Sequence, residues 1–518
     1  MKSRTENSIR NSTVALTGQA ITILMSFLVR TAFIKLLDVS YLGINGLFSN
    51  ILSLLSFSEL GFATAITYAL YEPIANDNRE KITALMRLFK KVYWCVGVFV
   101  FIVGCLFIPW LDFFVGDTSQ LPERLPALWV IYILFLSDTA VSYFFTYKRT
   151  LVIASQNGHI NTLNTLMFNV IKNVTQLITL LFWKSYLFYL LIQIICTVSS
   201  NVLISRKADR LFPYLNQYKT AKLDSATLSR IKKNVFGMSS HKLGAVIVNG
   251  TDNILITRFA GIVTTGIYSN YYLLTSTIRT MYLQCLSPIT ASVGNLLAEA
   301  NAEKIKTHFY NVFFVNAYIA IFSTTCLSSL MSPFISLMWG TQYTLDRITV
   351  FAISLNFYLS CMRTTLSIFM DADGLFWELR WKSVVESIVN LVASIIFAGP
   401  LKLGLLGVIL GTTVSTVVTN LWWEPYAIYK HVLNERLSAY FIQYLRYTAI
   451  LLLSIVASSM ICNSMEDTLI MFVVKCIAAF SVPNIIFFLA CRRCDEYGFF
   501  ASMARKLFGK IIKGRRRV

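Results

Sequence analysis

The chain has 518 residues, of which 56% are hydrophobic, 14% aromatic and 14% charged, and its formal net charge is +20. Soluble domains carry roughly 25% charged residues, so this composition excludes an ordinary soluble enzyme, and its apolar mass excludes a disordered chain. The basic residues lie between and after hydrophobic segments, which argues against a nucleic-acid partner. The class that remains is a polytopic membrane protein.

Hydrophobic runs long enough to cross a bilayer follow one another along the chain. A spanning helix needs about 20 apolar residues, and fourteen runs of that order are bounded by charged or turn residues. They predict an all-α protein of about fourteen transmembrane helices. The short eleventh run and the narrow gap between the fifth and sixth leave totals of 12 or 13 open. The runs occupy residues 12–34, 42–70, 92–115, 125–147, 161–182, 186–205, 235–257, 265–292, 309–338, 347–369, 383–398, 404–427, 444–462 and 468–490.

The first two spans carry polar stripes. We expect the first span to remain as an anchor, because it is too long for a signal peptide and no small-residue cleavage site follows it. Gln19, Ser26 and Arg30 share one face of this helix, and Glu59 belongs to a similar stripe in the second span. Such faces do not suit contact with lipid, so they predict the lining of a hydrated cavity.

The fourth and fifth spans each hold a charge near the middle. These residues are Asp138 and Lys172. A central charge costs about 2.5–3.5 kcal/mol on insertion scales, which makes each residue a candidate functional group. A structural pair between the two is an equally good interpretation.

A basic stretch divides the predicted spans into groups. Residues 206–233 contain eight lysines and arginines and are expected to form a cytoplasmic connector. It separates an N-terminal lobe, residues 1–205 with six spans, from a C-terminal lobe, residues 234–432 with six more.

A weak internal repeat supports this division. Leu42-Gly43-Ile44 and Thr265-Gly266-Ile267 share an offset of 223 residues, and each opens a span. Two six-helix lobes of the same topology imply a pseudo-twofold axis along the membrane normal. Chance recurrence of glycine in short turns is the alternative.

The seventh and eighth spans repeat the polar pattern of the first two. Lys242 and Asn249 share a face of the seventh span, with Asp252 on the adjoining face, while Thr275 and Arg279 share a face of the eighth. Four spans, two from each predicted lobe, therefore present polar stripes. We expect them to converge on one central cavity.

The charged residues of these stripes differ in what they indicate. Serines and threonines commonly serve as interhelical hydrogen bonds in membranes. Arg30 and Arg279 favour a substrate site, because a guanidinium is always charged and suits a bidentate grip on phosphate. For Lys242 and Lys172 the structural and binding interpretations are balanced.

The acidic residues have more than one interpretation. Glu59 and Asp252 could be salt-bridge partners, a site for a coupling Na⁺ or H⁺, or helix-end polarity. Other charges lie near the ends of spans, where long side chains reach toward water, and are discounted as functional candidates. These are Lys35, Lys475, Glu386 and Glu424.

The C-terminal part lies outside the repeat. Residues 433–490 hold spans 13 and 14, and residues 491–518 alternate apolar and basic side chains, which predicts an amphipathic cytoplasmic helix on anionic membrane lipids. Lysines and arginines number 34 on one set of loops and tails and five on the other. By the positive-inside rule both termini are cytoplasmic.

Sequence motifs give no support to an enzyme. The chain has no Walker A, G-x-S-x-G, H-E-x-x-H or strand-linked G-x-G-x-x-G pattern, and its predicted outer loops are about ten residues or fewer. We expect no catalytic residue, no metal site and no cofactor. A membrane polysaccharide polymerase or acyltransferase would need a larger outer domain, and it is kept as the rival from another class.

Two segments resemble a known family. They are "FIKLLDVSYLGINGLFSNILSLLSFSELGFATAITYALYEPIAN", which begins at Phe33, and "TDNILITRFAGIVTTGIYSNYYLL" at 251–274. Both are similar to bacterial polysaccharide transporters, the oligosaccharide flippase branch of the multidrug/oligosaccharidyl-lipid/polysaccharide exporter superfamily.

This resemblance implies alternating access between two six-helix lobes around a cationic cavity. Arg30 and Arg279 occupy places similar to the cavity arginines of related lipid II flippases, whereas Glu59 stands in span 2, which offers no clear arginine. Spans 13 and 14 resemble the groove that keeps the lipid tail in the bilayer.

The implied cargo is an undecaprenyl-pyrophosphate-linked oligosaccharide, moved across a bacterial inner membrane for capsule, O-antigen or other surface polysaccharide synthesis. A polysaccharide polymerase and chain-length machinery are the implied protein partners. A multidrug/cation antiporter of the same fold is the nearest alternative.

Overall fold

The structure is a computed structural model of the chain, and it describes most of the sequence. The residues described are 4–56, 62–116, 121–122, 125–155, 157–218, 223–286, 289–298, 301–375 and 378–502, and in stretches such as 4–17 and 236–249 the description is of the backbone. Within these ranges the regular structure is helical throughout, as the sequence predicts. The chain forms two compact units, which we call the N-terminal unit, residues 1–266, and the C-terminal unit, residues 267–518.

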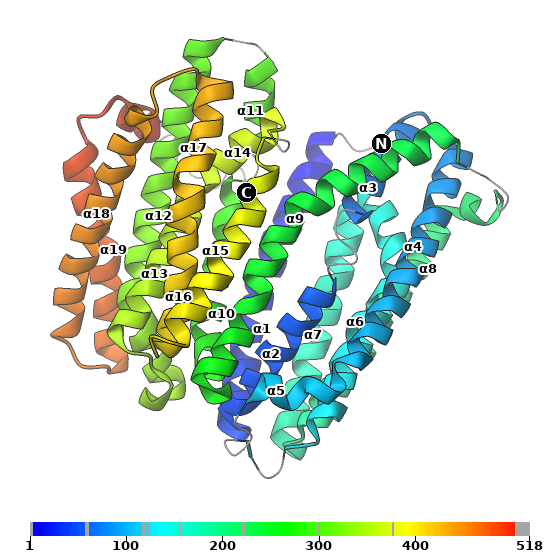
Figure 1. The fold of residues 1–518 in the computed structure, drawn as a ribbon, viewed down its shortest axis with the longest axis horizontal. Helices are drawn as coiled ribbons and strands as arrows, with labels where there is room; N and C mark the ends of the chain where they lie inside the picture. The colour runs from blue at the N-terminus through cyan, green and yellow to red at the C-terminus, as the bar shows by residue number, and fades with distance from the viewer. Residues whose placement is uncertain are drawn as a thin grey trace, which may run out of the picture. The chain divides into compact units, whose positions relative to one another are not determined.

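Long helices packed side by side make up the N-terminal unit (Figure 1). Helix α1 packs on α7, α4 on α6, α6 on α8, and α2 on α9. The helices are α1 (Arg4–Leu36), α2 (Val39–Leu55), α3 (Phe62–Ala75), α4 (Arg79–Leu106), α5 (Leu111–Val115), α6 (Leu128–Ala154), α7 (Gly158–Trp183), α8 (Tyr186–Leu211), α9 (Ser225–Ala260) and the first residues of α10 (Ile262–Leu286).

Two glycines let α2 and the start of α10 approach closely. A Cβ on Gly43 would overlap the carbonyl oxygen of Ile262, and a Cβ on Gly266 would overlap that of Val39. Val39 and Ile262 are 223 residues apart, as are Gly43 and Gly266. Each side of the contact is thus the sequence counterpart of the other, which is the property of a contact about a twofold axis. The glycines that suggested the repeat are the two halves of one symmetrical crossing.

The C-terminal unit is built around α12, which packs on α13, α18 and α19, and Figure 1 shows α18 and α19 running beside it. A Cβ on Gly411 would overlap Ser394, so glycine brings α16 close to α15. The helices are α11 (Ile289–Ala298), α12 (Ala302–Trp339), α13 (Arg347–Met362), α14 (Thr364–Asp373), α15 (Arg380–Ala398), α16 (Gly404–Ser415), α17 (Leu421–Ile428), α18 (Ser438–Asn463) and α19 (Leu469–Cys491).

Nine helices among the described residues are long and apolar enough to cross a membrane. They correspond to nine of the fourteen predicted spans, and the other five predicted spans coincide with α1, with α2 and α3, with α9, with α10, and with α13 and α14. Four of these five carry the polar stripes found in the sequence. Helix α2 is apolar but has 17 residues, too few for a full span by itself, and the total of about fourteen stays a prediction.

The division by contacts differs from the connector expected at 206–233. Helix α8 continues to Leu211 and α9 begins at Ser225, so both ends of that stretch are helical. Because α9 packs on α2 and α3, it belongs to the N-terminal unit. The lobe boundaries proposed from the sequence stay predictions. Residues 503–518 of the predicted amphipathic tail lie outside the described residues.

Candidate functional site

Arg279 on α10 carries a charge that its neighbours leave uncompensated. Its Nη1 atom donates hydrogen bonds to Cys361 Sγ and Thr364 Oγ1, both at 3.2 Å, and its Cζ lies 5.3 Å from the centroid of the Tyr282 ring. All three partners are uncharged. Across the ranges that the structure describes, no carboxylate forms an ion pair with this side chain. The guanidinium is therefore available to an anion.

Buried hydrogen bonds fix the position of this guanidinium. The Tyr282 hydroxyl contacts Asn316 Oδ1 on α12 and lies 3.1 Å from the carbonyl oxygen of Cys361 on α13. Asn316 Nδ2 donates to the same carbonyl at 3.2 Å. Helices α10, α12 and α13 are thus joined beside the short interruption at Arg363 that separates α13 from α14. A satisfied buried network of this kind holds its members in one arrangement.

A second charged group in the same unit is neutral as a whole. Glu424, which is 0% exposed, accepts hydrogen bonds from Arg363 Nη2 at 2.6 Å, Arg363 Nε at 3.0 Å and Lys382 Nζ at 2.7 Å. Glu386 completes this buried quartet at 3.3 Å from Lys382 and 3.6 Å from Arg363. Asn420 Nδ2 also donates to Glu386, at 2.5 Å. Two cations face two carboxylates, so the quartet has no spare charge for a substrate.

The quartet corrects one prediction from the sequence. Glu386 and Glu424 were expected to reach toward water, but both lie inside the helix bundle because cations on α13–α14 and α15 neutralise them. Lys475 itself is 3% exposed, but its Nζ atom reaches Asp467, a 43% exposed residue of the segment between α18 and α19, at 2.5 Å, in agreement with the expected reach toward the end of the span. Lys35 is exposed, as predicted.

Arg30 lies in the N-terminal unit beside an aromatic cluster. It is half-buried on α1 and interacts electrostatically with Tyr189 of α8. Ring centroids are 5.2 Å apart for Phe33 and Tyr189 and 4.8 Å apart for Tyr41 and Tyr186. Sequence reasoning missed Tyr186 and Tyr189. Their spacing of three residues places them on one face of a helix, and this was the available signal.

Asp138 and Lys172 come together with a third residue that the sequence did not suggest. Gln193 Nε2 on α8 donates to Asp138 Oδ2 at 2.9 Å, and Asp138 and Lys172 attract each other electrostatically. The described contacts include no direct ion pair between them. The arrangement links α6, α7 and α8, and both interpretations of Asp138 and Lys172 stay predictions.

The remaining predicted site residues are less fully placed. Asp252 is half-buried on α9, and its Oδ1 atom is buried with no hydrogen-bond partner in the described part of the chain. The Thr275 hydroxyl donates to carbonyls of its own helix at 3.1 Å. Gln19 and Ser26 are half-buried on α1. Glu59 lies outside the described residues, as do the side chains of Lys242 and Asn249.

Comparisons with known proteins agree with a transporter fold. A family described as polysaccharide biosynthesis protein matches residues 8–293. The chain is similar to the lipid II flippase MurJ in an inward closed conformation, with 16% identity, a TM-score of 0.61, and 93% of this chain and 99% of that chain covered. It is also similar to an inward-facing multidrug resistance MATE family transporter of the MOP superfamily, with 14% identity, a TM-score of 0.59, and 80% and 98% covered.

A third similar structure is a MOP superfamily transporter from Pyrococcus furiosus, with 14% identity, a TM-score of 0.55, and 83% of this chain and 96% of that chain covered. No curated protein sequence matches the chain significantly. At these identities the likeness concerns the fold. The predicted all-α, multi-pass membrane architecture is confirmed.

Proposed function

The chain belongs to the polysaccharide biosynthesis protein family, and on this basis we propose that it is a flippase for a lipid-linked oligosaccharide. The proposed cargo is an oligosaccharide repeat unit on undecaprenyl pyrophosphate. It moves by alternating access from the cytoplasmic to the outer leaflet of a bacterial inner membrane, for capsule, O-antigen or other surface polysaccharide synthesis. The excess of basic residues on one set of loops supports cytoplasmic termini.

The physical difficulty of this task is the head group of the cargo. A diphosphate and several sugars lose their hydration in the hydrocarbon core, and burying an ion without a partner is prohibitive. A fixed cation that already lies in the protein replaces part of that hydration without reorganising when the cargo arrives.

Arg279 is the observation that supports the proposal most strongly. Its guanidinium is oriented by a thiol, a hydroxyl and an aromatic ring, and none of these neutralises it. Arg363 of the quartet gives the contrast, because its charge is neutralised by the carboxylates of Glu386 and Glu424. A guanidinium left without an acid suits bidentate contact with a phosphate. Arg30, Lys172 and Lys242 stay predicted contacts of the same cargo.

The source of energy is a separate proposal. The unpartnered oxygen of Asp252 could exchange a proton or coordinate Na⁺ as the protein changes state. The same observation favours the alternative function, a multidrug/cation antiporter of the same fold. Asp252→Asn distinguishes them. A flippase that is coupled to an ion through Asp252 loses surface polysaccharide export in this variant, whereas an antiporter loses ion-coupled drug efflux and leaves export unchanged.

Complementation tests the flippase proposal. Cells that lack the protein receive the wild type, Arg279→Gln, Arg279→Lys or, as a control, Lys402→Gln, which alters an exposed lysine. We expect Arg279→Gln to abolish surface polysaccharide and to accumulate lipid-linked oligosaccharide, although the protein still inserts. Arg279→Lys should retain part of the activity because it keeps the charge. Normal export by Arg279→Gln at wild-type protein levels would contradict the proposal.

Contacts with other components are further proposals. A polysaccharide polymerase and chain-length machinery would act on the cargo after it has crossed the membrane. The basic tail, residues 491–518, would lie on anionic lipids.

A further inference from the structure

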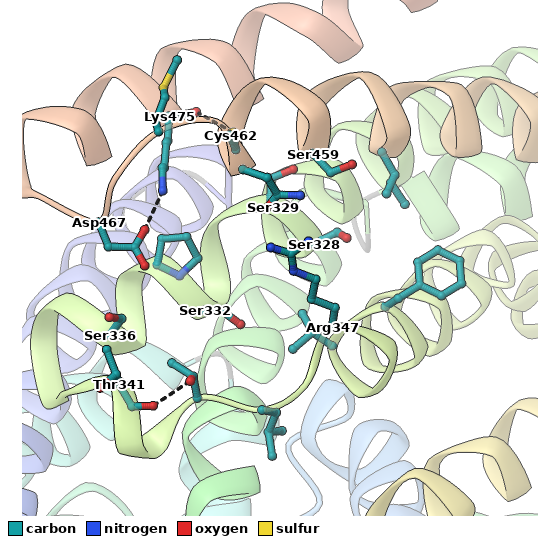
Figure 2. A pocket seen from close by; sticks show the side chains of 18 of the residues that line it. Ser328, Ser329, Ser332, Ser336, Thr341, Arg347, Ser459, Cys462, Asp467 and Lys475 are labelled. Carbon is teal, nitrogen blue, oxygen red and sulfur yellow. Dashed lines mark hydrogen bonds and ion pairs between the residues drawn. The ribbon is translucent and has the colours of Figure 1, made fainter.

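A second polar site lies in the C-terminal unit, separate from Arg279 and from the buried quartet. It is a pocket of about 690 Å³ between the end of α12, the start of α13, and the segment that joins α18 to α19 (Figure 2). This volume falls within the range of roughly 300–1,000 Å³ typical of small-molecule sites. No residue of the Arg279 site or of the quartet lines it.

Hydroxyl groups line one wall of this pocket. Ser328, Ser332 and Ser336 follow one another at intervals of four residues, so they form a row along α12. Ser332 Oγ lies 3.0 Å from the Tyr271 hydroxyl. A serine inside a helix usually donates to the carbonyl four residues earlier. Within the described residues, Ser328 and Ser336 make no such bond, so their hydroxyls are free to meet a ligand.

Ser329 is the most informative member of this wall. Its side chain is 7% exposed, and its Oγ atom is buried with no hydrogen-bond partner in the described part of the protein. Pro333, which also lines the pocket, has no amide hydrogen to give to the Ser329 carbonyl. A buried polar atom that lacks a partner costs about 1–3 kcal/mol. Solvent does not reach this atom in the ligand-free pocket, so the Ser329 side chain has to rotate into the pocket before a ligand can supply the missing hydrogen bond and remove this cost.

A guanidinium enters the pocket from the other side. Arg347 is the first residue of α13, and Figure 2 shows its side chain reaching toward the serines of α12. A cation at a helix N-terminus is unfavourable for the helix, and Asp346 caps this end by accepting from the Thr349 amide at 3.0 Å. Arg347 therefore does not stabilise the N-terminus of α13. Over the described ranges it forms no ion pair.

The charges around the pocket balance, and this determines the class of ligand. Arg347 and Lys475 face Glu466 and Asp467, and the Lys475–Asp467 pair is 2.5 Å long. A phosphate or carboxylate ligand would meet repulsion from the two acids, and an apolar ligand would leave the hydroxyls unsatisfied. Vicinal hydroxyls of a sugar both donate and accept, so they suit carboxylates, a guanidinium and serines together. The apolar face of a sugar ring suits Phe351, which lines the pocket and is 37% exposed.

We propose that this pocket binds one or two uncharged sugar rings through Arg347, Ser329 and the acids of the α18–α19 segment. That these rings belong to the transported cargo depends on the proposed flippase function. In that case the pocket holds the sugar portion of the cargo, at a site separate from Arg279.

Ligand-observed NMR on the full-length protein in lipid nanodiscs tests the proposal. The probes are maltose, the N-acetylglucosamine disaccharide and, for a lipid head group, glycerol 3-phosphate. We expect saturable binding of at least one disaccharide and a loss of affinity of about tenfold or more in Arg347→Gln, because a charged hydrogen bond is removed. Ser329→Ala is a smaller change than Arg347→Gln and should disturb folding less. It should weaken disaccharide binding by a smaller factor than Arg347→Gln does. Lys402→Gln, which alters an exposed lysine of the same unit outside the pocket, should bind as the wild type does.

Each contrary result has a defined meaning. Absence of saturable disaccharide binding, or equal binding by wild type, Arg347→Gln and Ser329→Ala, overturns the proposal. Binding of glycerol 3-phosphate without binding of either disaccharide also overturns it, in favour of a lipid head group. The measurement uses free sugars, so a negative result does not contradict the proposal that export depends on Arg279. Loss of the flippase proposal would likewise leave measured sugar binding intact.

Discussion

Replacing Glu424 by glutamine should destabilise the protein strongly, because it removes one of four balanced charges at a position that is itself fully buried. Glu424 is 0% exposed and accepts three hydrogen bonds of 2.6–3.0 Å from Arg363 and Lys382. The glutamine variant would leave these two cations with Glu386 as their single acid, at 3.3 and 3.6 Å. Breaking a buried ion pair by removing one partner costs about 3–5 kcal/mol.

Thermal unfolding of the purified protein measures this effect. We expect a clearly lower midpoint for Glu424→Gln than for Glu435→Gln, in which an exposed pair with Lys306 is lost and the change should be small. The double variant Lys382→Met, Glu424→Gln restores the charge balance, so it should melt above Glu424→Gln alone. The reasoning is refuted if Glu424→Gln has the same melting midpoint as Glu435→Gln. It is also refuted if the double variant has a lower midpoint than Glu424→Gln alone.

Two further predictions concern the frame of the fold. Gly43→Ala and Gly266→Ala should each lower the melting midpoint by similar amounts, corresponding to about 1–3 kcal/mol of overpacking, because each Cβ meets a backbone oxygen of the facing helix. Gly158→Ala, where no atom lies within 4 Å, should be neutral, and unequal effects of the first two would argue against a symmetrical crossing. Partial burial alone would raise the pKa of Asp346, but hydrogen bonds from Thr349 bring it below its ordinary value of 3.8. The ionised Asp346 carboxylate therefore stabilises the fold above about pH 3.8, and this contribution is lost as the pH falls through the lowered pKa. Asp346→Asn keeps the helix cap but does not titrate. The melting midpoint of this variant should therefore depend less on pH in that range.

The fold could be predicted because its determinants are local. Long apolar runs between charged turns specify membrane helices from composition alone, and the breaks near Lys184 and Gly340 coincide with the ends of α7 and α12. The glycine pair at positions 43 and 266 was also visible as a repeat. Its meaning as a close helix crossing needed three dimensions, because no sequence pattern states which backbone faces a glycine.

The site could be predicted in part. Arg279 was identified because an arginine inside a predicted span needs an explanation, and the structure gives it neutral partners. The quartet around Glu424 was missed because its members are widely separated in the sequence, so each looked like an isolated charge at the end of a span. The pocket at Arg347 was missed for a related reason. Serines on α12 are typical of ordinary helix packing until an unpartnered hydroxyl and a guanidinium are seen to share a cavity.

The most direct test of the central claim is transport by the purified protein in proteoliposomes that contain undecaprenyl-pyrophosphate-linked oligosaccharide. The fraction of cargo that a membrane-impermeant sugar-modifying enzyme can reach is followed over time. We predict that wild-type protein and Lys402→Gln make nearly all of the cargo accessible, whereas Arg279→Gln leaves access at the level of protein-free vesicles. Equal rates for the wild type and a correctly folded Arg279→Gln would contradict the claim that this guanidinium carries the diphosphate.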